Sequence, residues 1–205
     1  MEAISYNAIK ASAMLAKERG AYPTYEGSNW SKGIFPIDKA NEKAKAIVER
    51  SFHYDWESLR DLVKSEGIRN GYLMAIAPTS SISILVGTTQ TIEPIYKQIW
   101  HEENLSGMIK SVVPNLTLET INFYPSAYSI NQHDLVRAAA VRQKWIDQGQ
   151  SLNIFIRLDS VSGKQLHEIY MLAWSLGLKS TYYLRSQSKE ADDVVDRSME
   201  CVNCQ

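Results

Sequence analysis

The sequence of 205 residues contains only two cysteines, Cys201 and Cys204, and both lie in its last five positions. Two cysteines in a terminal segment cannot cross-link a core. This excludes a disulfide scaffold and favours a reducing compartment in which the pair has a redox or metal-binding role of its own. The four histidines show neither mutual metal-ligand spacing nor closeness to the cysteines. We therefore expect no metal site in this chain.

The sequence also lacks long apolar runs and any large excess of charge. No apolar stretch reaches the ~20 residues that a membrane-spanning helix requires. The first residues have neither the basic start nor the apolar core of a signal peptide. A formal net charge of −1 offers no basic surface for nucleic acid. These absences predict a globular, cytoplasmic chain that has no membrane or nucleic-acid partner.

In the first third of the sequence, apolar residues recur at helical spacing. This periodicity predicts helices over 3–19, 39–51 and 56–66. A turn-rich stretch, 22–36, separates the first two helices. The apolar run YLMAIAP at 72–78 then predicts a buried strand.

The middle of the sequence has weaker patterns. It indicates short strands around 108–113 and a loop rich in Asn, Tyr and Pro over 122–131. The apolar residues of the helix expected next are Leu135, Ala138, Val141 and Trp145.

The final third contains a strand, a helix and a second strand in succession. SLNIFIRL at 151–158 and LKSTYYL at 178–184 have the composition of strands. Between them, Ser162 and Gln165 fit a capping box for a helix that Gly177 ends. Such a crossover makes the two strands parallel, so the alternation predicts an α/β fold with a covered parallel sheet.

Small hydroxyl side chains follow the first of these strands. Thr79, Ser80 and Ser81 come directly after Pro78 at a predicted strand-to-helix turn. Free backbone N–H groups and hydroxyls at such a turn suit an anion such as phosphate, although ordinary helix capping explains them as well. No GxxxxGK[ST] or GxGxxG pattern appears, so the common nucleotide-binding loops have no support.

Two adjacent tyrosines, Tyr182 and Tyr183, end the last predicted strand. Neighbouring side chains of a regular strand point to opposite faces, so we expect one phenol to be buried and the other exposed. Strand propensity alone is the alternative to a functional pair. Because ligands bind beyond the carboxyl ends of parallel strands, we expect the tyrosines and the hydroxyl group to share one rim.

The sequence from Gln187 onward has no aromatic residue and little apolar periodicity, which predicts a mobile tail. The CVNC spacing within it lets two thiols close a disulfide or supply half of a zinc site. With no further ligands nearby, the redox interpretation is favoured.

The stretch from Trp56 to Pro78 resembles the signature of the ribonucleotide reductase large subunit. The matching positions are Trp56, Leu59, Gly67, Ile68, Arg69, Asn70, Met74, Ala75 and Pro78. TSSISILVGTTQTIEP continues the likeness, as do KERGAYPTYEGSNWSKGIFPID before the signature and RQKWIDQGQSLNIFI after it. The whole chain is similar to the C-terminal portion of a class I (aerobic) large subunit. The resemblance implies the C-terminal part of a ten-stranded α/β barrel over 1–186 and a mobile redox tail over 187–205.

The resemblance also implies roles for the unusual residues. In this family a ribonucleoside diphosphate binds inside the barrel, and the loop that matches Pro78, Thr79, Ser80 and Ser81 holds its phosphates. A radical on a separate small subunit enters the barrel through adjacent tyrosines that match Tyr182 and Tyr183. A phenol has a pKa of about 10 and keeps its proton at neutral pH, so its oxidation must move an electron and a proton together.

Cys201 and Cys204 match the family's tail dithiol, which reduces the active-site disulfide and is itself reduced by thioredoxin or glutaredoxin. The resemblance implies no cofactor in this chain, and a diiron or dimanganese radical centre on the small subunit. The radical-forming and ribose-reducing cysteines of the family lie upstream of the matched region, as do its regulatory sites. We therefore expect the isolated chain to be inactive.

Three hypotheses for function remain open from the sequence. In the first, the chain begins at its own Met1 and is one part of a divided large subunit. It then reduces ribonucleoside diphosphates for DNA synthesis only with an N-terminal polypeptide that carries the active-site cysteines, and with the small subunit. In the second, it is a non-catalytic module that binds and regulates a complete reductase. The third, a small thiol oxidoreductase, fits poorly because such enzymes carry their CxxC at a helix start. A segment cut from a longer subunit is also compatible with the sequence.

Overall fold

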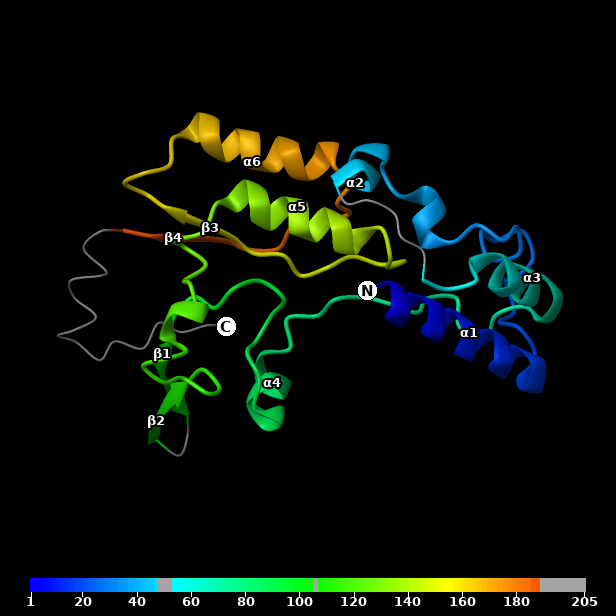
Figure 1. Cartoon of the computed structure of the whole chain (residues 1–205), viewed down its shortest axis with the longest axis horizontal. Coiled ribbons are helices and arrows are strands. Elements are labelled where there is room, and N and C mark those ends of the chain that lie inside the picture. Colours follow the sequence, from blue (N-terminus) through cyan, green and yellow to red (C-terminus); the bar gives the residue numbers. More distant parts are fainter. Residues whose placement is uncertain (48–52, 105–106, 189–205) are drawn as a thin grey trace. The chain divides into compact units, whose positions relative to one another are not determined.

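The computed structural model describes residues 1–47, 53–104 and 107–188 (Figure 1). The chain divides into two compact units that alternate along the sequence. The first unit contains Met1–Ile76, Val136–Gln150 and Met171–Ser180. The second contains Ala77–Leu135, Ser151–Tyr170 and the chain from Thr181 onward. Each unit is therefore assembled from segments that are distant in sequence.

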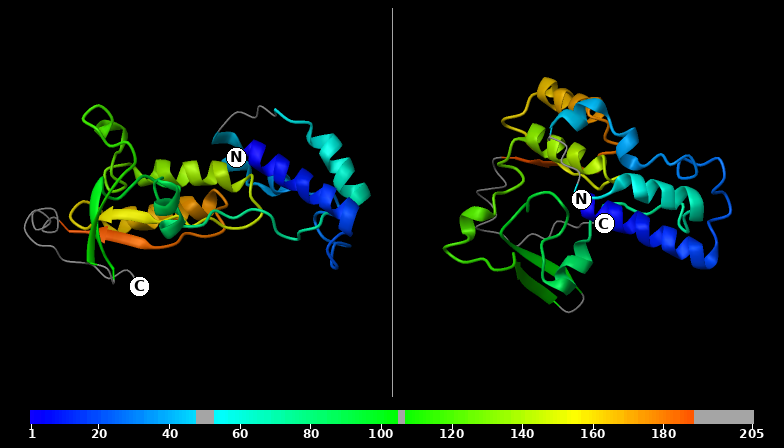
Figure 2. Two further views of the ribbon diagram at one scale, coloured as in Figure 1. Left: turned by 90° about the horizontal axis from the view of Figure 1, so that it is seen from below. Right: turned by 45° about the vertical axis from the view of Figure 1, so that its right-hand side comes forward.

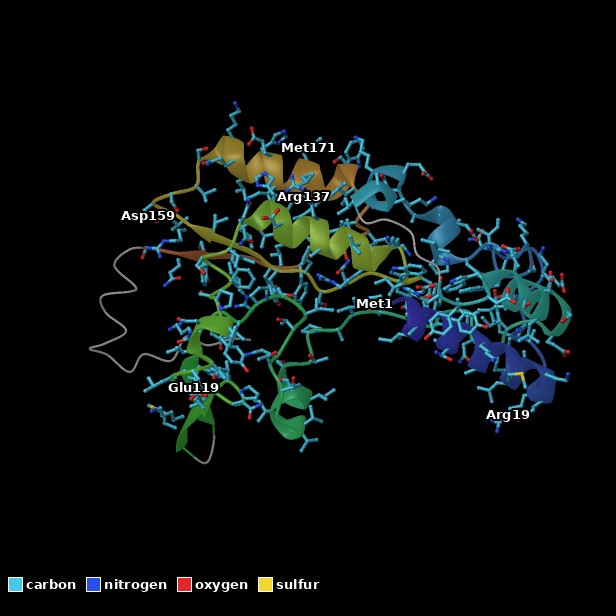
Figure 3. The ribbon with its side chains drawn as sticks, in the orientation of Figure 1. Met1, Arg19, Glu119, Arg137, Asp159 and Met171 are labelled. Atoms are coloured by element: carbon cyan, nitrogen blue, oxygen red, sulfur yellow. The ribbon has the colours of Figure 1, made fainter. Side chains whose placement is uncertain are left out.

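Helices α1 (Glu2–Arg19) and α3 (Trp56–Glu66) pack together in the first unit and confirm two of the predicted helices. Met1 and Arg19 mark the two ends of α1 in Figure 3. The buried residues between and around these helices include Ile9, Ala13, Leu59, Val63 and Ile68. The helix expected over 39–51 is shorter. A 3₁₀ turn, η1 (Pro36–Lys39), precedes α2 (Glu42–Ile47), and 48–52 lie outside the described residues.

The segment YLMAIAP is extended, but the prediction of a buried strand there is wrong. Among the described residues, its one ladder contact is a single parallel bridge between Ile76 and Gln150. The backbone N–H groups of Leu73 and Met74 donate instead to the Asp147 carboxylate, at 2.8 and 2.7 Å. A side chain thus takes the donors that a neighbouring strand would have paired, and the ladder does not extend.

In the second unit, β3 (Ile154–Arg157) and β4 (Leu184–Gln187) form a parallel pair, with Ile154 opposite Leu184 (Figures 1 and 2). Helix α6 (Gly163–Ser175) connects them, which confirms the predicted strand–helix–strand order. The capping box is also confirmed. Ser162 N–H donates to Gln165 Oε1 at 2.8 Å, and Gln165 N–H donates to Ser162 Oγ at 3.3 Å.

The second strand lies later than the sequence predicted. It was expected over 178–184, but β4 begins at Leu184, so both tyrosines precede it. They lie at the amino end of β4 and not at its carboxyl end. The β-propensity of these residues indicated an extended segment. Which of them pair is decided by the position of β3, and residue propensities carry no information about the partner strand.

A hairpin of β1 (Ile99–Asn104) and β2 (Gly107–Val112) completes the strands of the described chain. Only β2 was expected, because the polar sequence of β1 shows no alternation. The loop expected over 122–131 is confirmed apart from a short 3₁₀ turn, η2 (Ile121–Phe123).

Two further helices complete the described elements. Helix α4 (Ser80–Val86) follows the hydroxyl-rich turn. Helix α5 (Gln132–Gln143) is confirmed but ends before Trp145. That indole leaves the helical pattern to stack on Trp56, with ring centroids 5.7 Å apart. Within the described residues, no helix combines the length and apolar character needed to cross a bilayer.

Gly67, which ends α3, provides a test of packing in the first unit. Its φ is +80°, and an added Cβ would lie 2.7 Å from the Ala21 Cβ. Gly20, which ends α1, has a similar φ of +78° but open space around it. Both Ala substitutions incur backbone strain of about 1 to 3 kcal/mol. We predict that Gly67→Ala lowers the free energy of unfolding by a further ~1 to 3 kcal/mol because of the clash, as measured by urea denaturation. Equal losses in the two variants would contradict this packing.

Candidate functional site

The chain enters β4 through an irregular hydrogen-bond pattern at the two tyrosines. Ile154 N–H donates to the Tyr183 carbonyl at 2.9 Å, as a regular parallel ladder requires. In that ladder Tyr183 N–H would donate to the Leu152 carbonyl. Tyr182 N–H takes this acceptor instead, at 2.7 Å, and Tyr183 N–H donates to Asn153 Oδ1 at 3.2 Å. The chain is offset by one residue here, as at a β-bulge.

This offset explains why the expected alternation of the phenols is wrong. Tyr182 is 49% exposed and Tyr183 is 48% exposed, so neither is the buried member of an alternating pair. Their ring centroids lie 4.0 Å apart with an interplanar angle of 47°. The Tyr182 hydroxyl donates to the Tyr183 hydroxyl at 3.3 Å. The two phenols therefore form one unit joined by an O–H···O contact.

The contact between the phenols changes the acidity of the donor. The hydrogen bond to Tyr183 raises the pKa of Tyr182, because a donated hydrogen bond stabilises the protonated phenol. Electrostatic interaction with Tyr183 and a small loss of hydration act in the same direction, and the Arg185 charge opposes them. Tyr182 therefore keeps its proton throughout the neutral range.

Behind the tyrosines lies a buried pair of polar residues that the sequence did not single out. Asn153 is 4% exposed and Glu93 is 5% exposed. Glu93 Oε1 accepts hydrogen bonds from both the backbone N–H and the side-chain Nδ2 of Asn153. These two bonds leave Asn153 Oδ1 directed at the Tyr183 N–H. No spacing signal connects residues 60 positions apart, so only the folded chain reveals them.

Arg185 was also missed, although it lies two residues after Tyr183. Side chains two residues apart on a strand share a face. The Arg185 guanidinium carbon lies 5.5 Å from the Tyr183 ring centroid. Its charge also lowers the pKa of Tyr128, although burial is the larger effect and raises that pKa overall. One cation thus stands close to three phenols.

The hydroxyl-rich turn precedes α4 in the same unit. Thr79 has φ +57° and ψ +24°, a left-handed conformation that a β-branched residue rarely adopts. Its hydroxyl donates to the Pro78 carbonyl at 2.8 Å and does not cap the helix. Within the described chain, the exposed hydroxyls of Ser80 and Ser81 have no hydrogen-bond partner. The capping alternative therefore does not account for the turn.

The expectation that this turn and the tyrosines share a rim at the carboxyl ends of two strands is wrong, because the tyrosines lie at the amino end of β4 and the segment before the turn is not a strand. Cys201 and Cys204 lie outside the described residues, and their role stays a prediction. A separate cavity of about 830 Å³ in the first unit, lined by residues that include Trp30, Lys39, Lys144 and Asp147, contains none of the predicted site residues.

Comparison with known proteins identifies the family. The model of the ribonucleotide reductase barrel domain matches residues 1–184. This chain belongs to that family. The chain is 68% identical over its whole length to the ribonucleoside-diphosphate reductase subunit alpha of Helicobacter pylori and covers 27% of that protein. The ribonucleoside-diphosphate reductase subunit alpha of Treponema pallidum is 42% identical over 93% of the chain, and the chain covers 21% of that protein. The ribonucleoside-diphosphate reductase 1 subunit alpha of Salmonella typhimurium is 33% identical over the whole chain, and the chain covers 28% of that protein.

These matches confirm the resemblance to ribonucleotide reductase and the α/β barrel class. The chain spans about a quarter of the length of the curated relatives that it matches. The strand pairing described above is accordingly that of a segment of the barrel domain.

The phenol contact yields a titration test. Tyr183→Phe removes the acceptor, so we predict that the pKa of Tyr182 falls towards the ordinary tyrosine value. The measurement is ¹⁹F NMR of 3-fluorotyrosine placed at position 182 alone. Tyr72→Phe serves as the control, because that side chain is 76% exposed in the other unit. An unchanged Tyr182 titration in the Tyr183 variant would show that the contact does not form in solution.

Proposed function

We propose that this chain is the C-terminal portion of a ribonucleoside-diphosphate reductase alpha subunit and carries the radical-transfer tyrosines of that enzyme. The observation that supports this most directly is the 3.3 Å contact between the hydroxyls of Tyr182 and Tyr183. The reaction is the reduction of ribonucleoside diphosphates to deoxyribonucleoside diphosphates. The chain is inactive alone, because the cysteines that act on the ribose belong to other parts of the subunit.

The geometry of the tyrosine pair suits transfer of a hydrogen atom. When Tyr183 has lost an electron and a proton to the radical-bearing small subunit, the Tyr182 hydroxyl, 3.3 Å from the Tyr183 oxygen, can donate its hydrogen to that oxygen. Its transfer regenerates the Tyr183 phenol and leaves a phenoxyl radical on Tyr182. No net charge forms in this step. A charge would be costly to create once the assembled enzyme has excluded water from the pair.

The hydroxyl-rich turn is the proposed phosphate site, formed by Pro78, Thr79, Ser80 and Ser81. The backbone N–H groups at the start of α4 have no partner within a helix, and two serine hydroxyls are available beside them. Thr79 holds a strained conformation, which occurs most often where a ligand or substrate is bound. The backbone N–H groups and the two serine hydroxyls of the turn are thus available as hydrogen-bond donors to an anion.

An exposed apolar face on α4 supports an association with the rest of the subunit. Ile82, Ile84, Leu85 and Val86 are between 55% and 86% exposed. A contiguous aliphatic patch of this kind marks an interaction surface. Its proposed partner is the N-terminal large-subunit polypeptide that carries the active-site cysteines.

Three further components complete the proposed enzyme. The small subunit supplies the radical from its diiron or dimanganese centre. Cys201 and Cys204 return electrons to the active site from thioredoxin or glutaredoxin. The proposed compartment is the cytoplasm, where such dithiols are kept reduced.

Substitution of the tyrosines tests the proposed function. In the enzyme assembled with the rest of the alpha subunit and the small subunit, we predict that Tyr182→Phe and Tyr183→Phe each abolish deoxyribonucleotide formation. Phenylalanine keeps the ring but cannot form a phenoxyl radical. The isolated chain and Tyr72→Phe are the negative and positive controls. Wild-type turnover in either pair variant would refute radical transfer and support the regulatory-module alternative.

The phosphate site has an independent test. Thr79→Ala combined with Ser81→Ala should weaken binding of a ribonucleoside diphosphate to the assembled enzyme by about 1 to 3 kcal/mol, because charge-assisted hydrogen bonds are lost. Thr88→Ala removes an exposed hydroxyl just beyond α4 and should leave affinity unchanged. Equal affinity of the double variant and the wild type, measured by equilibrium dialysis, would remove the assignment.

A further inference from the structure

A regular strand cannot bring the phenols of neighbouring tyrosines together, so some other feature of the chain must do so. The hydrogen-bond offset at Tyr182 and Tyr183 does this locally. A backbone offset persists only where surrounding groups satisfy the displaced donors and acceptors. The displaced donor here is the Tyr183 N–H, and Asn153 Oδ1 is its acceptor.

Asn153 could not serve as that acceptor reliably without support. A side-chain amide can turn about its last bond and present its nitrogen instead of its oxygen. Glu93 prevents this, because a carboxylate accepts hydrogen bonds and cannot donate them, so Nδ2 must face Glu93. A second hydrogen bond, 3.2 Å from the Asn153 backbone N–H to the same oxygen, holds the carboxylate next to the first residue of β3.

Arg185 acts on the opposite side of the pair, at the ring of Tyr183. A guanidinium over an aromatic face is attracted by the negative face of the ring. It also places a positive charge beside both phenols. Such a charge opposes a positively charged ring, so electron loss without proton loss becomes less favourable.

We propose that Asn153, oriented by Glu93, is a positioning residue that holds the two phenols in hydrogen-bond contact, and that Arg185 keeps a positive charge beside them. The inference deepens the proposed radical transfer and rests on it for its catalytic meaning. Its geometric content, however, is independent of any activity. Glu93 acts on the tyrosines only through its hydrogen bonds to Asn153.

The experiment uses 3-fluorotyrosine at position 182 as the probe, titrated by ¹⁹F NMR in the full chain and in the assembled enzyme. Asn153→Ala releases the offset and separates the phenols, so the pKa of Tyr182 should fall, as in Tyr183→Phe. Arg185→Gln removes the cation, so the pKa of Tyr182 should rise. Arg185→Lys keeps the charge and should stay close to the wild type. The ionisable groups near the pair in the described chain include Arg185 on β4, Tyr128 before α5, Glu93 behind Asn153, and Lys97, which lines a small cavity together with Asn153 and Arg185.

Loss of folding alone would not produce shifts of opposite sign, and circular dichroism monitors the fold of each variant. If Asn153→Ala does not fold, a comparison of the Tyr182 titration in Glu93→Gln and in Glu93→Ala takes its place. Glutamine keeps an oxygen acceptor for Asn153 and should retain the wild-type titration, whereas alanine should lower the Tyr182 pKa. Shifts of the same sign in the Asn153 and Arg185 variants, or no shift in either, would overturn the inference.

Turnover of the assembled enzyme separates the two proposals. A misplacement of about 1 Å can cost on the order of a hundredfold in rate. We expect Asn153→Ala to lower kcat at least about tenfold and to leave KM for the diphosphate unchanged. If the titration shifts appear but Tyr182→Phe is fully active, the proposed radical transfer fails and the positioning role stands. If Tyr182→Phe is inactive but the shifts are absent, the positioning role fails and the radical transfer stands.

Discussion

The hydrogen bond from the Tyr182 N–H to the Leu152 carbonyl is the interaction on which the site depends. It takes the acceptor that a regular ladder would give to Tyr183 and shifts the entry into β4 by one residue. That shift places the two phenols on the same side of the chain and allows their hydroxyls to make contact. It also displaces the Tyr183 N–H, which donates to Asn153 Oδ1 instead. β3 and β4 beyond this point pair regularly, so the irregularity is confined to the tyrosines.

Locally encoded features were predictable from the sequence, and features that depend on distant partners were not. The capping box at Ser162 and Gln165 formed as expected, because both of its hydrogen bonds lie within four residues. Helices α1 and α3 likewise follow their own periodicity. YLMAIAP failed as a strand because Asp147, more than 70 residues away, takes two of its backbone donors. The predicted bounds of β4 were wrong for a similar reason, because its pairing depends on β3, which is distant in sequence.

The candidate site shows the same division. Tyr182, Tyr183 and the hydroxyl-rich turn could be identified from residue type, adjacency and resemblance to a family. Their supporting residues could not, because Glu93 and Asn153 are ordinary buried polar residues until the fold joins them. Arg185 carried a weak signal, since residues two apart share a strand face, but the expected strand ended before it. Support for a functional pair therefore has to be found in three dimensions.

The exposure of the phenols sets a further condition on their chemistry. Both tyrosines are about half exposed in the described chain, and water competes for a hydrogen bond as long as 3.3 Å. A hydrogen atom passes reliably between the phenols only where that competition is removed and the local dielectric is low. The aliphatic face of α4 in the same unit is exposed as well. A polypeptide that covers both surfaces would bury apolar area on α4 and exclude water from the phenols in one association, so the proposed subunit assembly would also remove the water that competes for the contact between the phenols.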